Sequence, residues 1–162
     1  MALTVGDALP DATFTTMGAE GPSTVSVAEI AAQGRAVIFG LPGAYTDTCT
    51  TAHVPSFIRN MDALKAKGVM AVYCLAVNDV FVMQAWAEST GADKAGIVML
   101  SDADASFTKA IEMAFTASPV GLIDRSKRYA MVVDGGTVTV LQEDENPGVC
   151  STSAGEAILD VL

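Results

Sequence analysis

Cys49 has the sequence setting of a reactive thiol. It ends the octapeptide Pro42-Gly43-Ala44-Tyr45-Thr46-Asp47-Thr48-Cys49, which joins an apolar run over residues 35–41 to a segment with helical spacing of its apolar residues. We therefore expect Cys49 in the first turn of a helix. Backbone N–H groups without intrahelical partners and the positive end of the helix dipole favour the thiolate there, and the thiolate is the nucleophilic form of cysteine.

A helix end alone is too weak to activate a thiol fully. It contributes about 0.3–1 kcal/mol, or up to ~2 kcal/mol in a partly buried geometry. Lowering the pKa of a cysteine from about 8.5 to about 6 takes roughly 3.4 kcal/mol. A cation must supply the difference, and an arginine suits because its guanidinium group stays charged and offers several planar donors.

Arg128 is the best placed of the possible cations. The chain has four arginines: Arg35, Arg59, Arg125 and Arg128. Arg128 immediately precedes a strand-like run over 129–133, whose end could lie beside the end of the strand before Cys49. Arg59 follows Cys49 by ten residues, which puts it far along the helix. Arg125 stays open as an alternative, although we expect it to be a solvated loop charge or a partner of groups around the site.

Three neighbours of Cys49 have more than one possible role. Thr46 could be a turn residue or supply a hydroxyl to the site, and spacing alone does not separate the two. Pro42 ends the preceding strand and could also shield the sulfur. Asp47 is unfavourable to a nearby thiolate, and we expect it to cap the helix by accepting from the N–H of Cys49 or Thr50.

The single histidine and the other two cysteines have simpler expected roles. His53 lies one turn beyond Cys49, which suggests zinc or a Cys–His nucleophile. Too few ligands are close in sequence for zinc, so we expect a structural hydrogen bond. Cys74 lies inside the apolar run 72–77 and is predicted to be a small buried hydrophobe. Cys150 follows a loop over 145–149 and is predicted to be more mobile.

The residues around Cys49 also carry a family resemblance. Pro42, Thr46 and Cys49 form a Pro-x-x-x-Thr-x-x-Cys pattern that resembles the active-site motif of the peroxiredoxins, and residues 42–57 resemble the type II, or peroxiredoxin-5-like, branch. Residues 126–133 resemble the segment that delivers the family's active-site arginine, here Arg128. The resemblance spans essentially the whole chain. It departs from the branch at Asp47, where proline is frequent, and at Ser56, where glycine is frequent.

The resemblance implies a function and a set of site residues. It implies a thiol-dependent peroxidase that reduces hydrogen peroxide and small alkyl hydroperoxides through a sulfenic acid on Cys49, with Thr46, Arg128 and Pro42 as the other catalytic residues. It also implies a homodimer, no metal or organic cofactor, and either glutathione with glutaredoxin or thioredoxin as reductant. Some relatives resolve the sulfenic acid with a late cysteine, which Cys150 resembles in approximate position. We prefer Cys150 as the resolving thiol, then an external thiol, then Cys74.

Two other functions stay open on the sequence. A thiol–disulfide oxidoreductase would share the fold, but it usually has a second cysteine three positions after the first, and residue 52 is alanine. A noncatalytic interaction module on a thioredoxin-like scaffold is the other alternative, and Asp47 is the residue that favours it.

The order of the expected elements predicts how the site is held. Strand-like runs at 12–16, 35–41, 69–77, 97–101, 129–133 and 137–142 alternate with helices, and the last two are joined by Asp134-Gly135-Gly136 as a hairpin. Helices are expected from Cys49 to Gly68, over Val80–Thr90, from Asp104 to about Met113, and from Ser153 to Leu162. This pattern predicts an α/β, thioredoxin-like fold with a mixed central sheet flanked by helices.

Composition limits the remaining possibilities. The 162 residues, 51% hydrophobic, are enough for a single thioredoxin-like domain over 1–162. A net charge of −10 argues against binding to nucleic acid or anionic membranes. The first residues lack the pattern of a signal peptide, and three cysteines without metal-type spacing fit a reducing compartment. We therefore expect a cytoplasmic protein.

Overall fold

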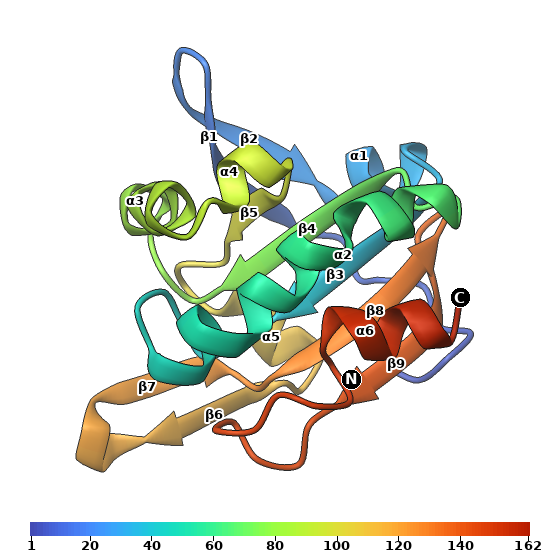
Figure 1. Ribbon diagram of the computed structural model, residues 1–162. Coiled ribbons are helices and arrows are strands. Elements are labelled where there is room, and N and C mark those ends of the chain that lie inside the picture. Colours follow the sequence, from blue (N-terminus) through green and yellow to red (C-terminus); the bar gives the residue numbers. More distant parts are fainter.

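A seven-stranded mixed sheet forms the centre of the molecule. The computed structural model describes residues 1–162, and its sheet has the strand order β2-β1-β5-β4-β3-β8-β9 (Figure 1). The strands are β1 (Thr13–Gly18), β2 (Gly21–Ser26), β3 (Arg35–Gly40), β4 (Ala71–Ala76), β5 (Val98–Ser101), β8 (Tyr129–Asp134) and β9 (Thr137–Glu143). Strands β3, β4 and β5 are parallel, and the other pairs are antiparallel. The predicted fold class is confirmed.

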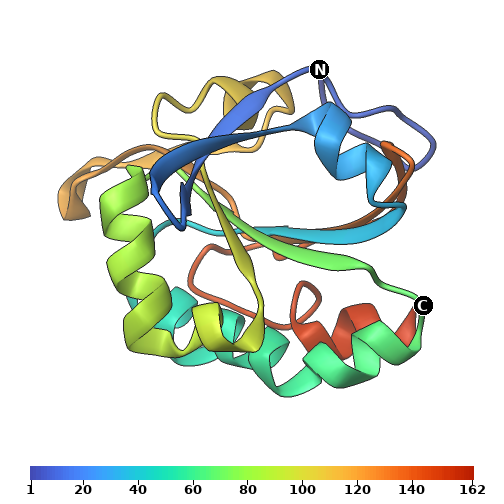
Figure 2. The ribbon, with the colours of Figure 1, turned by 90° about the horizontal axis from the view of Figure 1, so that it is seen from above.

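Helices cover both faces of the sheet. They are α1 (Val27–Ala32), α2 (Val54–Ala66), α3 (Val80–Thr90), α4 (Ala92–Ala95), α5 (Ser106–Ala110) and α6 (Gly155–Asp160). Figure 2 shows α2, α3, α4 and α6 on one face, and α1 and α5 on the other. Because both faces are covered, the central strands are buried on both sides and read as continuous apolar runs. No helix has the length and apolar character needed to cross a membrane.

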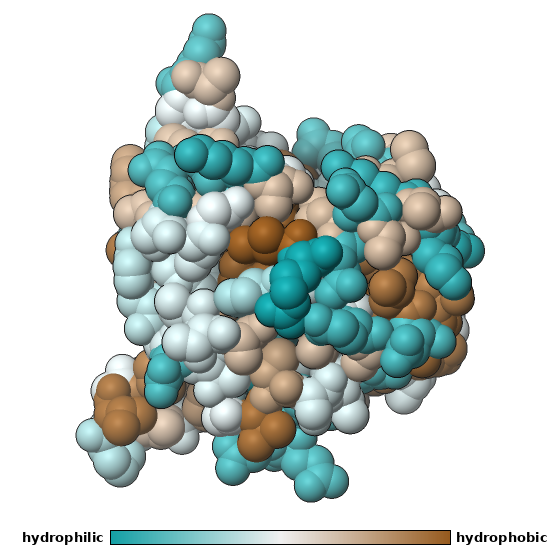
Figure 3. All heavy atoms as spheres, viewed as in Figure 1, coloured by the Kyte–Doolittle hydropathy of each residue, from teal (hydrophilic) through white to brown (hydrophobic).

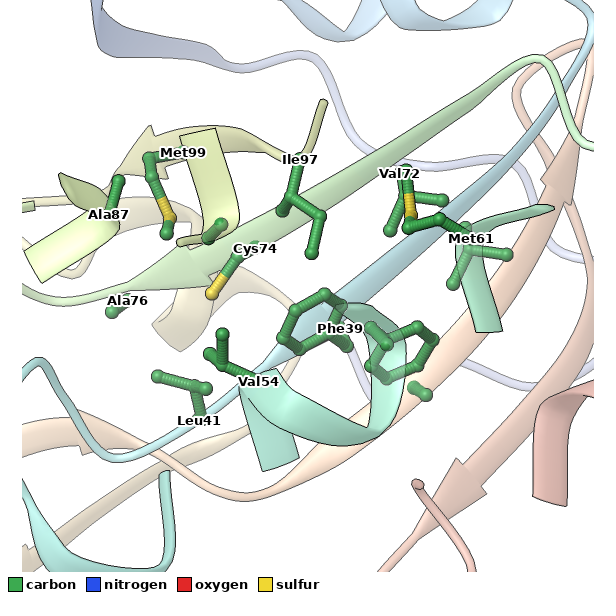
Figure 4. Close-up of a cluster of buried hydrophobic side chains, with 14 of the residues drawn as sticks. Phe39, Leu41, Val54, Met61, Val72, Cys74, Ala76, Ala87, Ile97 and Met99 are labelled. Atoms are coloured by element: carbon green, nitrogen blue, oxygen red, sulfur yellow. The ribbon is translucent and has the colours of Figure 1, made fainter. Parts of the chain in front are cut away.

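The core divides into two clusters, one on each face of the sheet. Val37 and Phe39 of β3 belong to the cluster under α2, whereas Ala36 and Ile38 belong to the cluster under α1 and α5. Cys74 of β4 lies in the first cluster and is fully buried (Figure 4). Burial raises the pKa of its thiol well above the usual value, so Cys74 is the small buried hydrophobe that its apolar run predicts.

The start of the helix after Cys49 is wider than an α-helix. The helical segment begins at Asp47, passes through the π-helical stretch η1 (Cys49–His53), and continues as α2. The N–H of Val54 donates to the carbonyl of Cys49, five residues back. Pro55 explains the widening, because it has no N–H for the carbonyl of Thr51 and its ring crowds that carbonyl in a regular α-helix.

Several predicted elements agree with the structure, and several were missed. The helix Val80–Thr90 and the hairpin at Asp134-Gly135-Gly136 are present as expected, and both glycines of the hairpin have positive φ. The helices expected over 104–113 and 153–162 are shorter, Ser106–Ala110 and Gly155–Asp160. β2 and α1 were not predicted from the sequence. β2 is a mostly exposed edge strand with the sequence Gly-Pro-Ser-Thr-Val-Ser, and α1 is only six residues long.

A second, two-stranded sheet leads the chain into the site. It consists of β6 (Ala114–Ala117) and β7 (Leu122–Ser126), joined by the short helix η2 (Ser118–Val120). It projects from the body of the molecule, and Figure 3 shows hydrophobic atoms at its end. Both Val120 and Ile123 are exposed there. The sequence analysis missed this hairpin as well.

Candidate active site

Cys49 is held at the junction of a strand, a loop and a helix. It is fully buried and belongs to the core cluster under α2. Its thiol is free, as are those of Cys74 and Cys150. None of the hydrogen bonds in the structure takes up the N–H of Cys49, whereas the N–H of Thr50 donates to the carbonyl of Thr46. Cys49 therefore lies in the first helical turn, as predicted, with one backbone donor still available.

Arg128 brings its guanidinium group to the sulfur of Cys49. Its Nη2 donates to Sγ of Cys49 at 3.1 Å, and the Arg128 side chain is almost fully buried. Arg128 reaches this position because it lies at the start of β8, which is the antiparallel neighbour of the strand before Cys49. The juxtaposition of Cys49 and Arg128 is the one that the strand order predicts.

The remaining donors of Arg128 go to neutral groups. Nε and Nη2 donate to the carbonyl of Pro147 at 3.1 and 2.8 Å, and Nη1 lies 2.9 Å from Nδ1 of His53. Arg128 forms no salt bridge with a carboxylate. A buried cation is costly without a counter-charge. Among the groups bonded to Arg128, only the sulfur of Cys49 can carry one, so the arrangement favours a thiolate.

His53 is fully buried and contacts Arg128. Its Nε2 lies 3.0 Å from the carbonyl of Ser153, which can only accept, so Nε2 carries the proton and Nδ1 accepts from Arg128. Burial, followed by the charge of Arg128, lowers the pKa of His53 to about 3. The ring therefore stays neutral. The structural hydrogen bond expected for His53 is present, but its contact with Arg128 was missed.

Thr46 and Pro42 lie on the loop that joins β3 to the helical segment of Cys49. The hydroxyl of Thr46 donates to the carbonyl of Gly43 at 2.7 Å, which leaves its oxygen lone pairs as acceptors. Pro42 is buried, and its carbonyl accepts from Nη1 of Arg125 at 3.1 Å. Arg125 thus contacts the backbone of the loop rather than the sulfur, which agrees with its expected role as a partner of groups around the site.

The capping role expected for Asp47 is wrong. Asp47 is the first helical residue rather than the residue before the helix, and its carboxylate accepts no hydrogen bond. The side chain is exposed. Thr46 occupies the preceding position, and its carbonyl accepts from the N–H of Thr50, so one of the two donors expected for the cap is already paired.

A cavity of about 440 Å³ is lined by Arg128, whose guanidinium group contacts the sulfur of Cys49. Thr46 and Asp47 also line it, as do Phe115 and Leu122 of the β6–β7 hairpin. Cys49 itself does not line the cavity and has no exposed surface. A small electrophile that enters the cavity therefore meets Arg128 and Thr46 first, and the apolar wall of the hairpin can accommodate a short alkyl group.

The loop between β9 and α6 closes the site from the C-terminal side. It supplies the carbonyls of Pro147 to Arg128 and of Ser153 to His53. A third contact joins the hydroxyl of Thr48 to the carbonyl of Gly148 at 2.9 Å. The same loop carries Cys150, which is half-buried, and burial raises the pKa of its thiol. The place of Cys150 in this loop was predicted from the sequence, but the roles of the carbonyls were not. Every residue has a backbone carbonyl, so the residue type does not indicate which of them accepts a hydrogen bond in the site.

Known proteins are similar to this chain over almost its whole length. The Redoxin family matches residues 4–159 of the chain. A chloroplastic peroxiredoxin-2E-2 from Oryza sativa is 46% identical over 99% of this chain and 72% of its own length. The crystal structure of reduced Prx3 from Vibrio vulnificus in complex with H2O2 is 42% identical, with a TM-score of 0.90 over 98% of both chains.

The same comparison contradicts one expectation. The relative from Oryza sativa described above is chloroplastic, and a peroxiredoxin-2F from the same organism, 41% identical over 86% of this chain and 70% of its own length, is mitochondrial. The prediction of a cytoplasmic location is therefore wrong. It was based on the number of cysteines and the composition of the first residues, and neither separates the cytosol from other reducing compartments.

Proposed function

This chain belongs to the Redoxin family and, within it, to the type II peroxiredoxins, and from that membership we propose that Cys49 is the residue that reacts with peroxide. The protein is a thiol-dependent peroxidase. The observation that supports Cys49 is the hydrogen bond of 3.1 Å to its sulfur from Arg128, a residue that lines the cavity. Neither Cys74 nor Cys150 has a hydrogen bond from an arginine.

The chemistry at Cys49 is a nucleophilic displacement on oxygen. The thiolate attacks the terminal, protonated oxygen of hydrogen peroxide or of a small alkyl hydroperoxide. The S–O bond forms while the O–O bond breaks, so the sulfur is oxidised to a sulfenic acid and the peroxide is reduced. The leaving oxygen takes a proton from solvent and departs as water or as an alcohol.

Three groups support this displacement in the proposal. Arg128 stabilises the thiolate before attack and the charge on the oxygens during it, as donors in an oxyanion hole do. The unpaired N–H of Cys49 supplies a second donor. Thr46 orients the peroxide by accepting a hydrogen bond from its O–H, since the hydroxyl of Thr46 itself donates to the carbonyl of Gly43. Pro42 shields the sulfur from solvent.

The cycle then requires a second thiol. We propose Cys150 as the resolving residue, because its loop is tied to Thr48 and to Arg128. The Cys150 thiol attacks the sulfur of the sulfenic acid, water leaves, and a disulfide forms. An external dithiol of the thioredoxin type then reduces the disulfide, and glutathione with glutaredoxin is the alternative reductant.

We extend the proposal to the assembly of the chain. Residues 1–162 act as a single thioredoxin-like domain, and two copies form a homodimer. The support is a set of exposed apolar side chains on the loop between β3 and Cys49 and on the β6–β7 hairpin: Tyr45, Val120 and Ile123. Sedimentation equilibrium of the wild type and of Val120→Asp tests the dimer. A monomeric wild type would contradict it.

The central test follows the three cysteines after one equivalent of hydrogen peroxide. Mass spectrometry with and without a sulfenic-acid trap should show the first adduct on Cys49. An adduct on Cys74 or Cys150 instead would overturn the assignment. Loss of peroxide in the absence of any disulfide substrate separates a peroxidase from a thiol–disulfide oxidoreductase.

A further inference from the structure

We propose that Asp144 is a positioning residue for the peroxidase reaction, which fixes Arg128 through the loop between β9 and α6. The inference rests on the proposed role of Cys49. Asp144 lies just after β9, is buried, and has no contact with the sulfur of Cys49. It can therefore influence the chemistry only through other residues.

The carboxylate of Asp144 accepts hydrogen bonds from six donor groups, which belong to three consecutive residues. The N–H and the hydroxyl of Ser151 donate to it at 3.2 and 3.0 Å, and those of Thr152 both donate at 2.9 Å. The N–H of Ser153 donates at 3.4 Å, and its hydroxyl donates as well. Burial acts to raise the pKa of Asp144, but these hydrogen bonds together outweigh burial and lower the pKa to about 2. An ionised carboxylate suits such a set, because both of its oxygens accept and neither carries a proton.

The two ends of this cluster lead to the two residues that surround the sulfur. The N–H of Asp144 donates to the carbonyl of Arg128 at 3.0 Å, which fixes the start of β8. Ser153, at the other end, accepts from Nε2 of His53 at 3.0 Å. His53 in turn holds Nη1 of Arg128. Asp144 therefore fixes Arg128 both through the backbone and through His53.

The residues between Asp144 and Ser153 form the part of the loop that touches the guanidinium group. The carbonyl of Pro147 accepts twice from Arg128, and the carbonyl of Gly148 accepts from Thr48. A loop with its two ends drawn together at one carboxylate has fewer conformations available, so the carbonyl of Pro147 stays in place. Without the carboxylate, we expect Arg128 to lose its alignment with the sulfur.

Cys150 makes the same cluster relevant to resolution. It lies inside the loop, directly before Ser151, and its thiol and that of Cys49 are both free in this arrangement. We expect the loop to move when the two are joined. A disulfide needs Cα atoms within about 7 Å and a specific orientation. The loop that holds Arg128 in place for peroxide reduction is thus the segment that must be released for the disulfide. Asp144 stabilises the first of these two arrangements.

The test uses Asp144→Asn, which keeps the shape of the side chain and removes its charge. The rate constant for oxidation of Cys49 by hydrogen peroxide is measured in a single turnover at alkaline pH. We expect a decrease of about tenfold or more, because small displacements of catalytic groups have effects of that size. Native-state alkylation of Cys150 should become faster, while that of Cys74 stays unchanged. Glu145→Gln is the matched control, since Glu145 is an exposed neighbour with no hydrogen bond in the structure.

Repeating the measurement in the Arg128→Ala variant separates a role of Asp144 in positioning Arg128 from a general destabilisation of the protein. In Arg128→Ala there is no guanidinium group to align, so Asp144→Asn should lower the remaining rate by less than about twofold, a strongly non-additive result. Equal decreases in both backgrounds, or a wild-type rate for Asp144→Asn, would overturn the inference. If Asp144→Asn does not fold, Thr152→Val removes one donor and should give a smaller decrease with the same dependence on Arg128. A wild type whose Cys49 does not react would instead contradict the proposed function.

Discussion

Nη2 of Arg128 lies 3.1 Å from Sγ of Cys49, and each of the other hydrogen bonds of this guanidinium group goes to a neutral acceptor. Arg128 is thereby fixed in space while its charge stays available to the sulfur. A carboxylate in place of the carbonyl of Pro147 or the ring of His53 would neutralise the guanidinium group and weaken its effect on the thiolate. The neutrality of these partners is therefore as important as their geometry.

The first prediction concerns the nucleophile. Cys49→Ser should remove peroxidase activity almost completely, since a serine hydroxyl is not ionised near neutral pH and is a poor nucleophile for peroxide. Cys74→Ser and Cys150→Ser should leave the first turnover largely intact. Single-turnover loss of peroxide measures this. Substantial reduction of peroxide by Cys49→Ser would show that another residue is the nucleophile.

The second prediction concerns Arg128. Arg128→Ala should slow peroxide reduction by about 10²-fold or more, the effect typical of a lost donor to a developing negative charge. Raising the pH should not restore the rate, because Arg128 acts on the oxygens as well as on the thiolate. Arg128→Lys should recover only part of the rate, since an ammonium group cannot match the four contacts of the guanidinium group.

The pH profile of the rate tests this assignment. Complete recovery of Arg128→Ala at alkaline pH would restrict Arg128 to stabilising the thiolate. Arg125→Ala is the matched control, because Arg125 contacts the carbonyl of Pro42 and not the sulfur. A larger loss in Arg125→Ala than in Arg128→Ala would reverse the roles of the two residues.

The third prediction links His53 to stability. The pKa of His53 is lowered from 6.5 to about 3, so the unfolded chain binds one more proton than the folded chain between these values. The contribution of His53 to the free energy of unfolding should therefore be fully present above pH 6.5, and the free energy of unfolding should fall as the pH decreases below that value. The expected loss is about 2 kcal/mol between pH 7.5 and pH 5. Urea unfolding at several pH values measures it.

His53→Gln is the control for this loss. His53 is the only histidine of the chain. The lowered pKa of Asp144 affects stability only below about pH 4. The variant should consequently show almost no change in the free energy of unfolding between pH 7.5 and pH 5. An unchanged slope in His53→Gln would mean that another group takes up the proton.

The site was predictable from sequence where it depends on side-chain type and strand order. Cys49 and Arg128 each flank an apolar run, and adjacent strands of one sheet bring such positions together. The parts that were missed depend on backbone groups and on distant loops. The carbonyls of Pro147 and Ser153 have no signature in sequence, and Asp144 resembles any acidic residue at the end of a strand.

The missed elements of the fold have a similar explanation. β6 and β7 pair only with each other and are mostly half-buried, so their residues lack the alternation of buried apolar and exposed polar side chains that indicates a strand. The π-helical stretch depends on Pro55, but the effect of a proline on the turn before it cannot be separated from a simple helix start on sequence alone. The cap expected of Asp47 was wrong because the helix begins one residue earlier than the spacing suggested.

The fourth prediction concerns Thr46. Thr46→Val keeps the shape of the side chain but removes the hydroxyl, which donates to Gly43 and can accept from a peroxide. We expect the rate of peroxide reduction to fall by about 10-fold to 10²-fold with little change in stability. Thr46→Ser keeps the hydroxyl and should retain most of the rate. Equal rates for Thr46→Val and the wild type would restrict Thr46 to a turn residue.

The last prediction concerns the fate of the sulfenic acid. Cys150 is half-buried, and its raised pKa leaves it mostly as the thiol at neutral pH, so it should react with the sulfenic acid only after the loop over 145–153 has moved. After stoichiometric peroxide, we expect a peptide that joins Cys49 to Cys150. This peptide should form more slowly than Cys49 is oxidised. Its formation should accelerate as the pH rises toward the pKa of the Cys150 thiol. Non-reducing peptide mapping at timed intervals measures both steps, with Cys74→Ser as the control that preserves the pair. A lasting sulfenic acid on Cys49, with Cys150 still open to alkylation, would assign resolution to an external thiol such as glutathione.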